Sequence, residues 1–197
     1  MNLRLIAVLV TSSLVQGCIS THSYVDPQFH HASFGDLARS QPPYALSVKS
    51  EFQRNGVEQP RVERQLRDDV ERTLRASGVV VPYDGKGSAD GEISIVVNNV
   101  TDLGSAAAKG FGTGLTLGLV GSHVMDGYEM TARLTQSDSV EERKYQHAII
   151  STVGNAAGPP GLTPVALATA FNQVVDDLVL NFLKDMQSEG RLLPKAN

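Results

Sequence analysis

The sequence predicts an α+β domain: a mixed or antiparallel sheet of four to five strands with two helices packed on one face and a glycine-rich insert. Two segments, 60–77 and 164–189, carry apolar residues at helical spacing. Several shorter segments alternate apolar and polar residues, which is typical of half-buried strands. The order is strand, helix, two strands, insert, two strands and helix, which favours a single α+β domain.

The folded domain is expected to begin at Tyr44, with a strand over 44–52 in which apolar and polar residues alternate. A turn at 54–56 closes this strand, and Pro60 then occupies a position that is favoured at a helix start. Gly78 predicts the end of that helix. The outer faces of the helix hold five arginines interleaved with acidic residues, which indicates a solvated surface with ion pairs. A contact with phosphate or lipopolysaccharide is the alternative.

Four further strands are expected after the first helix. Residues 79–82 predict a short strand, and residues 92–100 predict the clearest one. Apolar residues on both faces of 92–100 favour a central place in the sheet. After a turn expected at 126–127, the alternating segments 128–134 and 142–153 predict two more strands.

The last expected helix covers the core. Thr163 is expected to cap it, Pro164 to lie in its first turn and Gly190 to mark its end. A broad apolar stripe runs along it and indicates burial against the sheet. Asp176 and Asp177 are expected on the opposite, solvent-exposed side.

Residues 104–126 form an apolar, glycine-rich segment with Lys109 and His123 as its possible cations. Each glycine costs a helix interior nearly 1 kcal/mol relative to alanine, which favours extended or irregular structure. Three interpretations stay open: a flap or hairpin over the core, a contact with a partner or a second copy, and insertion into a membrane as part of an oligomer. The residues assigned to such a contact are Gly110, Phe111, Gly112, Gly114, Leu115, Leu117, Gly118 and Leu119.

The N-terminal residues predict export. One positive charge, Arg4, precedes an apolar run over 5–15, and this run is shorter than the roughly 20 residues that a membrane-spanning helix needs. The run ends in Leu14-Val15-Gln16-Gly17-Cys18, which resembles a bacterial lipobox. Cys18 is the single cysteine of the chain, and lipidation would consume its thiol.

The lipobox resemblance implies a lipoprotein. It implies that residues 1–17 are removed, that Cys18 receives a diacylglycerol and an N-acyl chain, and that no other cofactor is needed. Two or more chains anchor a protein firmly, whereas one chain anchors it marginally. Because Asp does not follow Cys18, the resemblance favours the periplasmic face of the outer membrane. Residues 18–43, rich in serine and proline, are expected to be a tether, and residues 44–197 the folded domain.

Two segments, 24–28 and 109–115, resemble those of an uncharacterised group of proteobacterial outer-membrane lipoproteins. The element order is also similar to the small α+β periplasmic domains of lipoproteins that serve lipopolysaccharide assembly, transport or activation of penicillin-binding proteins. The resemblance implies no activity and no functional residues, because element order transfers function poorly.

Catalysis, metal binding and nucleic-acid binding are not expected. His30 and His31 are adjacent, but a metal site needs three or four converging ligands and only His22 lies nearby. Ser94, His147 and Asp138 are not linked by a Gly-x-Ser-x-Gly signature. The net charge of −4 argues against nucleic acid. The sequence therefore predicts a membrane-anchored, non-catalytic binding or assembly factor for an envelope protein; the alternative is a structural oligomer or pore component that uses residues 104–126.

Overall fold

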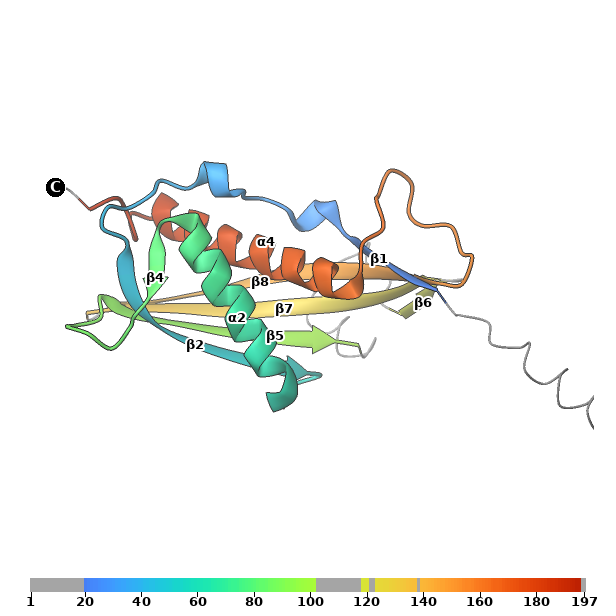
Figure 1. The fold of residues 1–197 in the computed structure, drawn as a ribbon, viewed down its shortest axis with the longest axis horizontal. Coiled ribbons are helices and arrows are strands. Elements are labelled where there is room, and N and C mark those ends of the chain that lie inside the picture. Colours follow the sequence, from blue (N-terminus) through green and yellow to red (C-terminus); the bar gives the residue numbers. More distant parts are fainter. Residues whose placement is uncertain (1–19, 102–117, 121–122, 138, 196–197) are drawn as a thin grey trace, which may run out of the picture.

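The computed structural model describes residues 20–101, 118–120, 123–137 and 139–195. These residues form one large sheet with two helices, α2 (Pro60–Ser77) and α4 (Leu167–Ser188), on the same face (Figure 1). The predicted α+β class with two helices on one face is confirmed. As predicted, Pro60 lies in the first turn of α2, and Gly78 ends the helix with a left-handed φ of 68°.

The sheet has eight strands, so the predicted number of four to five is wrong. The strands are β1 (Thr21–Val25), β2 (Tyr44–Arg54), β3 (Val57–Glu58), β4 (Val80–Pro82), β5 (Gly91–Val100), β6 (Gly118–Val120), β7 (His123–Gln136) and β8 (Ser139–Val153). The main path runs β1-β8-β7-β5-β2-β3, with β4 paired to β2 and β6 paired to β7. The unpredicted strands β1, β3 and β6 are too short for alternation to reveal them.

The sheet is mixed. β2 runs parallel to both β4 and β5, and the other pairs are antiparallel. β5 lies in the interior of the sheet between β2 and β7, as its apolar residues predict. Two short turns of 3-10 helix, η1 (Pro27–Phe29) and η2 (Phe34–Asp36), complete the regular structure.

The turn expected at 126–127 is wrong, because these residues lie inside β7. Asp126 pairs with Ile149 and Gly127 pairs with Ala148. β8 has 15 residues and supplies a partner along the whole of β7, so the strand accommodates the glycine. The glycine-rich segment lies largely outside the described residues; of it, the structure shows β6 and the first residues of β7, which pair with each other.

The expected tether over 18–43 differs from the structure from residue 20 onward. β1 pairs with β8 at one edge of the sheet, over residues 149–153. Residues 26–43, which we call the strap, then run along α4 to β2, toward the opposite edge (Figure 1). Tyr24 of β1 and Ala32 and Leu37 of the strap are buried. These apolar residues follow no helical or strand period, so the sequence resembled a linker although the segment packs on the domain.

α4 is buried on more than one side because three structures contact it. The sheet lies beneath it, α2 lies beside it, and the strap covers a further side (Figure 1). Leu178, Phe182, Leu183 and Met186 are fully buried. α4 begins at Leu167 rather than near Pro164, because the backbone of Val165 exchanges two hydrogen bonds with Ser23 of β1, at 2.8 and 3.2 Å. That pairing keeps the chain extended until Ala166 and fixes the start of the helix.

A substitution at Gly158 tests the docking of β1. A Cβ atom at Gly158 would overlap the Tyr24 ring, whereas one at Gly35 would have its nearest neighbour at an ordinary 3.8 Å. Neither glycine has a positive φ, so the contrast is steric. We expect Gly158→Ala to lower the free energy of unfolding by about 1–3 kcal/mol and Gly35→Ala to change it by under about 0.5 kcal/mol, in urea titrations. Equal effects of the two substitutions would contradict the close packing of Tyr24.

Candidate functional site

Most of the interaction site predicted from the sequence cannot be placed in the fold. Cys18 and residues 110–117 lie outside the described residues, and Gly118 and Leu119 lie in β6. The described residues contain two other features with functional potential. One is a polar cluster where the strap crosses α4. The other is a pocket between the N-terminal turns of the two helices and the sheet.

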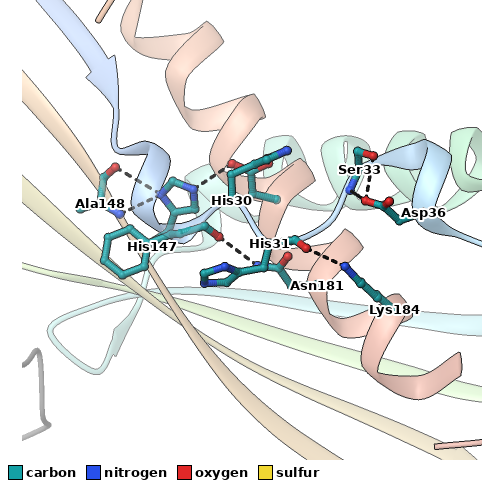
Figure 2. A network of polar contacts seen from close by, with 10 residues as sticks. His30, His31, Ser33, Asp36, His147, Ala148, Asn181 and Lys184 are labelled. Atoms are coloured by element: carbon teal, nitrogen blue, oxygen red, sulfur yellow. Dashed lines mark hydrogen bonds and ion pairs between the residues drawn. The ribbon is translucent and has the colours of Figure 1, made fainter. Parts of the chain in front are cut away.

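The polar cluster centres on Asp177 of α4, whose carboxylate binds two histidines, His30 and His147. Figure 2 shows His30 of the strap close to His147 of β8. Nε2 of His147 lies 3.0 Å from one oxygen, and Nδ1 of His30 lies 2.5 Å from the other. Asp177 is only 8% exposed and His147 is fully buried, so the predicted solvent-exposed place of Asp177 is wrong. The sequence assigned α4 one apolar side, but β8 and the strap cover the polar side as well.

His147 uses both ring nitrogens. The backbone N–H of Ala148 donates to Nδ1 at 2.8 Å, and the Ala148 carbonyl lies 3.2 Å from the same nitrogen. Because Nε2 faces the Asp177 carboxylate, which can only accept, we assign the ring proton to Nε2. The ring of Phe29 in η1 packs on the imidazole, with 5.3 Å between ring centroids. Nδ2 of Asn181 donates to the carbonyl of Phe29 at 3.1 Å. The strap is thus fixed to α4 by side chains from two turns of the helix.

These contacts belong to a longer polar seam between α4 and β8. Asp177, Asp185 and Glu189, at i, i+8 and i+12, meet every second residue of the strand. Tyr145 donates to Asp185 at 2.6 Å, and Arg143 pairs with Glu189 at 2.6 Å. Burial and the hydrogen bond to Asp185 raise the pKa of Tyr145, so its hydroxyl stays a donor. The seam holds the edge of the sheet to the last helix.

The hydrogen bonds of this cluster have a structural role, because they hold the strap on α4. Both nitrogens of His147 are occupied, and His31 is used through its carbonyl, which accepts from the ammonium of Lys184 at 2.9 Å. The structure does not bring together the serine, histidine and aspartate considered above: Ser94 and His147 lie on opposite faces of the sheet, and Asp138 is outside the described residues. No group of three metal-ligating side chains occurs within the described ranges.

A pocket of about 400 Å³ opens between the first turns of α2 and α4 and the three strands β2, β5 and β7. We call it the end pocket. Its lining residues are Phe52, Arg54, Val62, Gln65, Asn99, Asp126, Tyr128, Leu167, Ala168 and Phe171. A volume of this size suits a small ligand or one side chain of a partner.

Three aromatic rings form the floor of the end pocket. The Phe171 ring lies 5.9 Å from Phe52 and 5.7 Å from Tyr128, at tilted angles of 72° and 57°. Each ring is less than a tenth exposed. Leu167 forms part of the rim and is 57% exposed. The pocket therefore presents apolar surface that a ligand would remove from water.

Opposite charges lie on two sides of this floor. Burial raises the pKa of the Asp126 carboxyl, and the charge of Arg54 and a hydrogen bond from Asn99 offset the rise only in part. Burial and the nearby Asp126 also raise the pKa of Tyr128. Arg54 and Asp126 come from β2 and β7, with β5 between them, so they act on each other across a gap.

A larger hollow of about 730 Å³ is lined mainly by polar side chains, among them Gln146, Lys144 and Asn181. Oδ1 of Asn181 is buried and has no hydrogen-bond partner among the described residues. The hollow lacks the aromatic floor of the end pocket, and a water molecule would satisfy the Asn181 oxygen. We therefore regard the end pocket as the candidate site.

No protein-family model matches the chain, and no curated protein matches it. The fold is similar to a DUF330 protein from Xanthomonas campestris, at 19% identity and a TM-score of 0.43, covering 78% of this chain and 91% of that one. It is also similar to the PelC dodecamer from Paraburkholderia phytofirmans, at 15% identity and a TM-score of 0.37, covering 87% and 98%. It is similar as well to a proposed lipoprotein from Caulobacter crescentus, at 14% identity and a TM-score of 0.28, covering 72% of this chain and 85% of that one. Similarities this low assign no family and bring no function to the chain.

Replacing Asp177 tests the fastening of the strap. Asp177→Ala leaves the buried Nε2–H of His147 without an acceptor, so we expect the free energy of unfolding to fall by about 1–3 kcal/mol. Amide hydrogen exchange should accelerate over residues 26–38. Asp84→Ala is the matched control, since Asp84 is exposed and lies in a loop. Unchanged exchange in the strap of the Asp177 variant would contradict the fastening.

Proposed function

We propose that this chain is a lipid-anchored protein of the bacterial envelope whose domain binds another envelope component through the end pocket, without catalysis. The observation that carries the proposal is the pocket itself, which combines an aromatic floor, an exposed leucine at its rim and a carboxylate, Asp126, that forms no ion pair within 4 Å among the described residues. These are features of recognition. No hydroxyl or thiol nucleophile is hydrogen-bonded to a histidine in the part of the chain that the structure describes, which supports binding over catalysis.

The anchor rests on the N-terminal sequence. The resemblance of Leu14–Cys18 to a lipobox supports lipidation of Cys18, and the residues after it support the outer membrane. None of the helices in the described ranges is long and apolar enough to span a membrane. β1 begins at Thr21, three residues after Cys18, so the lipid would lie within about 10 Å of the sheet at 3.3 Å per residue. The domain would then be held directly at the membrane surface.

The end pocket lies near this anchored end. Val165, two residues before α4, pairs with Ser23 of β1, and Leu167 at the start of α4 lines the pocket. A ligand or partner close to the membrane surface would therefore meet the pocket first. This position supports an envelope component as the binding partner.

Removal of the thiol tests the anchor. In a bacterial host with lipoprotein processing, we expect the wild-type chain in the membrane fraction and Cys18→Ala in the soluble fraction, because the acyl chains supply the membrane affinity. Mass spectrometry of the N-terminal peptide should show a lipid on Cys18. Thr21→Ala, an exposed change three residues away, should leave the distribution unchanged. An unmodified Cys18 thiol in membrane-bound wild-type protein would contradict the proposal.

Photo-crosslinking tests the pocket as the binding surface. A photoreactive phenylalanine analogue replaces Leu167 at the pocket rim or, as the control, Val140 at the opposite end of the domain; their exposures are similar, at 57% and 54%. We expect a light-dependent adduct of defined mass from position 167 in intact cells and none from position 140. Adducts at both positions, or an adduct of twice the chain mass, would contradict the proposal, and the latter would favour the structural oligomer.

A further inference from the structure

We infer that the end pocket recognises the α-amino-acid group, with the ligand's ammonium on Asp126, its carboxylate on Arg54 and its apolar side chain on the aromatic floor. The inference rests on the proposed binding function of the pocket and assigns it a ligand class. Its basis is the placement of two opposite charges around one apolar surface.

The strand register sets the distance between the charges. Arg54 of β2 is the register partner of Asn99 in β5, and Asn99 is the partner of Tyr128 in β7. Asp126 lies two residues before Tyr128, so its side chain is on the same face. At about 4.8 Å per strand, the backbones of β2 and β7 are roughly 10 Å apart, and the two-residue offset places Asp126 about 7 Å further along the strand direction. An α-amino acid carries its two charges on adjacent groups and can bridge the remaining gap.

Asp126 is suited to an ammonium group. It forms no ion pair within 4 Å among the described residues, and it is partly buried. A desolvated carboxylate whose counter-charge, Arg54, lies beyond ion-pair distance gains more from a ligand cation than an exposed one does. The tilted rings of Tyr128 and Phe171 beside it also favour a cation on their faces.

Arg54 is suited to a carboxylate. Its guanidinium is exposed at the pocket, and a guanidinium can bind a carboxylate with two parallel hydrogen bonds. Leu167 and Ala168, the first residues of α4, line the same pocket, and no side chain caps this helix end. The free N–H groups of that turn add positive potential to the pocket.

Three compounds of nearly equal shape test the inference by calorimetric titration of the full-length protein purified in detergent. Phenylalanine carries both charges, phenethylamine lacks the carboxylate, and 3-phenylpropionate lacks the ammonium. We expect phenylalanine to bind at least about tenfold more tightly than either analogue, because each lost charge removes a charged hydrogen bond. Equal binding by either analogue would overturn the inference. If none of the three binds while the crosslink at position 167 persists, the ligand class is wrong and the proposed function stands.

Variants of the two charged residues separate recognition from folding. Asp126→Asn should remove the advantage of phenylalanine over 3-phenylpropionate, and Arg54→Gln should remove its advantage over phenethylamine. Arg133→Gln, in an ion pair on the opposite face of the sheet, is the control and should change neither. Unchanged discrimination in the Asp126 and Arg54 variants would overturn the inference.

The Asp126→Asn variant is expected to stay folded. Because burial raises the native pKa of Asp126, the folded state binds more protons than the unfolded state between the two pKa values, and stability falls as pH rises through that window. The neutral amide removes this loss, so the variant should be more stable than wild type at pH 7. The other charged or titratable groups facing Asp126 are Arg54 and Tyr128, and burial together with Asp126 raises the pKa of Tyr128.

The same group can come from a free amino acid or from one attached to a larger molecule through its side chain. Nε-acetyl-lysine represents the second source, since its α-amino and α-carboxyl groups are free. Tighter binding of L- or D-Nε-acetyl-lysine than of phenylalanine assigns the attached form, and the reverse order assigns the free form. N-acetylphenylalanine amide lacks both charges, and binding of this compound as tight as that of phenylalanine would overturn the inference.

Discussion

The burial of α4 on several sides is the constraint on which the rest of the structure depends. A helix that contacted the sheet without the strap would leave Asp177 with one of its two histidine partners, yet Asp177 and Leu180 are both buried. Burying them requires a second cover, and the strap supplies it with Ala32, Leu37 and the hydrogen bonds to Asp177 and Asn181. A buried carboxylate needs hydrogen-bond partners, and His30 and His147 supply them to Asp177. The N-terminal segment is therefore a component of the core.

The position of the candidate site is set by the residue at which α4 begins. Pairing of Val165 with Ser23 keeps the chain extended before α4, so the helix begins at Leu167. The strands beneath continue past this point, and among the described residues the ends of β2, β5 and β7 line the end pocket together with the first turns of α2 and α4. Residues at strand ends are then free to carry polar groups, which is why Arg54 and Asp126 stand beside an aromatic floor. The position of α4 therefore accounts both for the pocket at its N-terminus and for the packing of the strap along its side.

Periodicity predicted the parts of the fold that are regular. α2, β2, β5 and β8 follow from apolar spacing, with caps and turns close to those observed. The strap could not be predicted this way, because Ala32 and Leu37 become buried through contacts with a helix about 150 residues later. Gly127 resembles a turn residue in the sequence, but it pairs with Ala148 because β8 extends far enough to reach it. The end pocket was missed because Arg54 and Asp126 are far apart in sequence and only the sheet register brings them near each other.

The pairing of β1 with β8 has a mechanical consequence. If Cys18 is held in a bilayer while a partner holds the pocket, tension between them enters the domain at Thr21. Five register pairs join β1 to β8, and two backbone hydrogen bonds join Ser23 to Val165. A lateral pull would load these bonds together in shear and would reach α4 through its first turn. Stretching the envelope would then strain the binding site before it unfolded the sheet, which makes the first strand a force-bearing element.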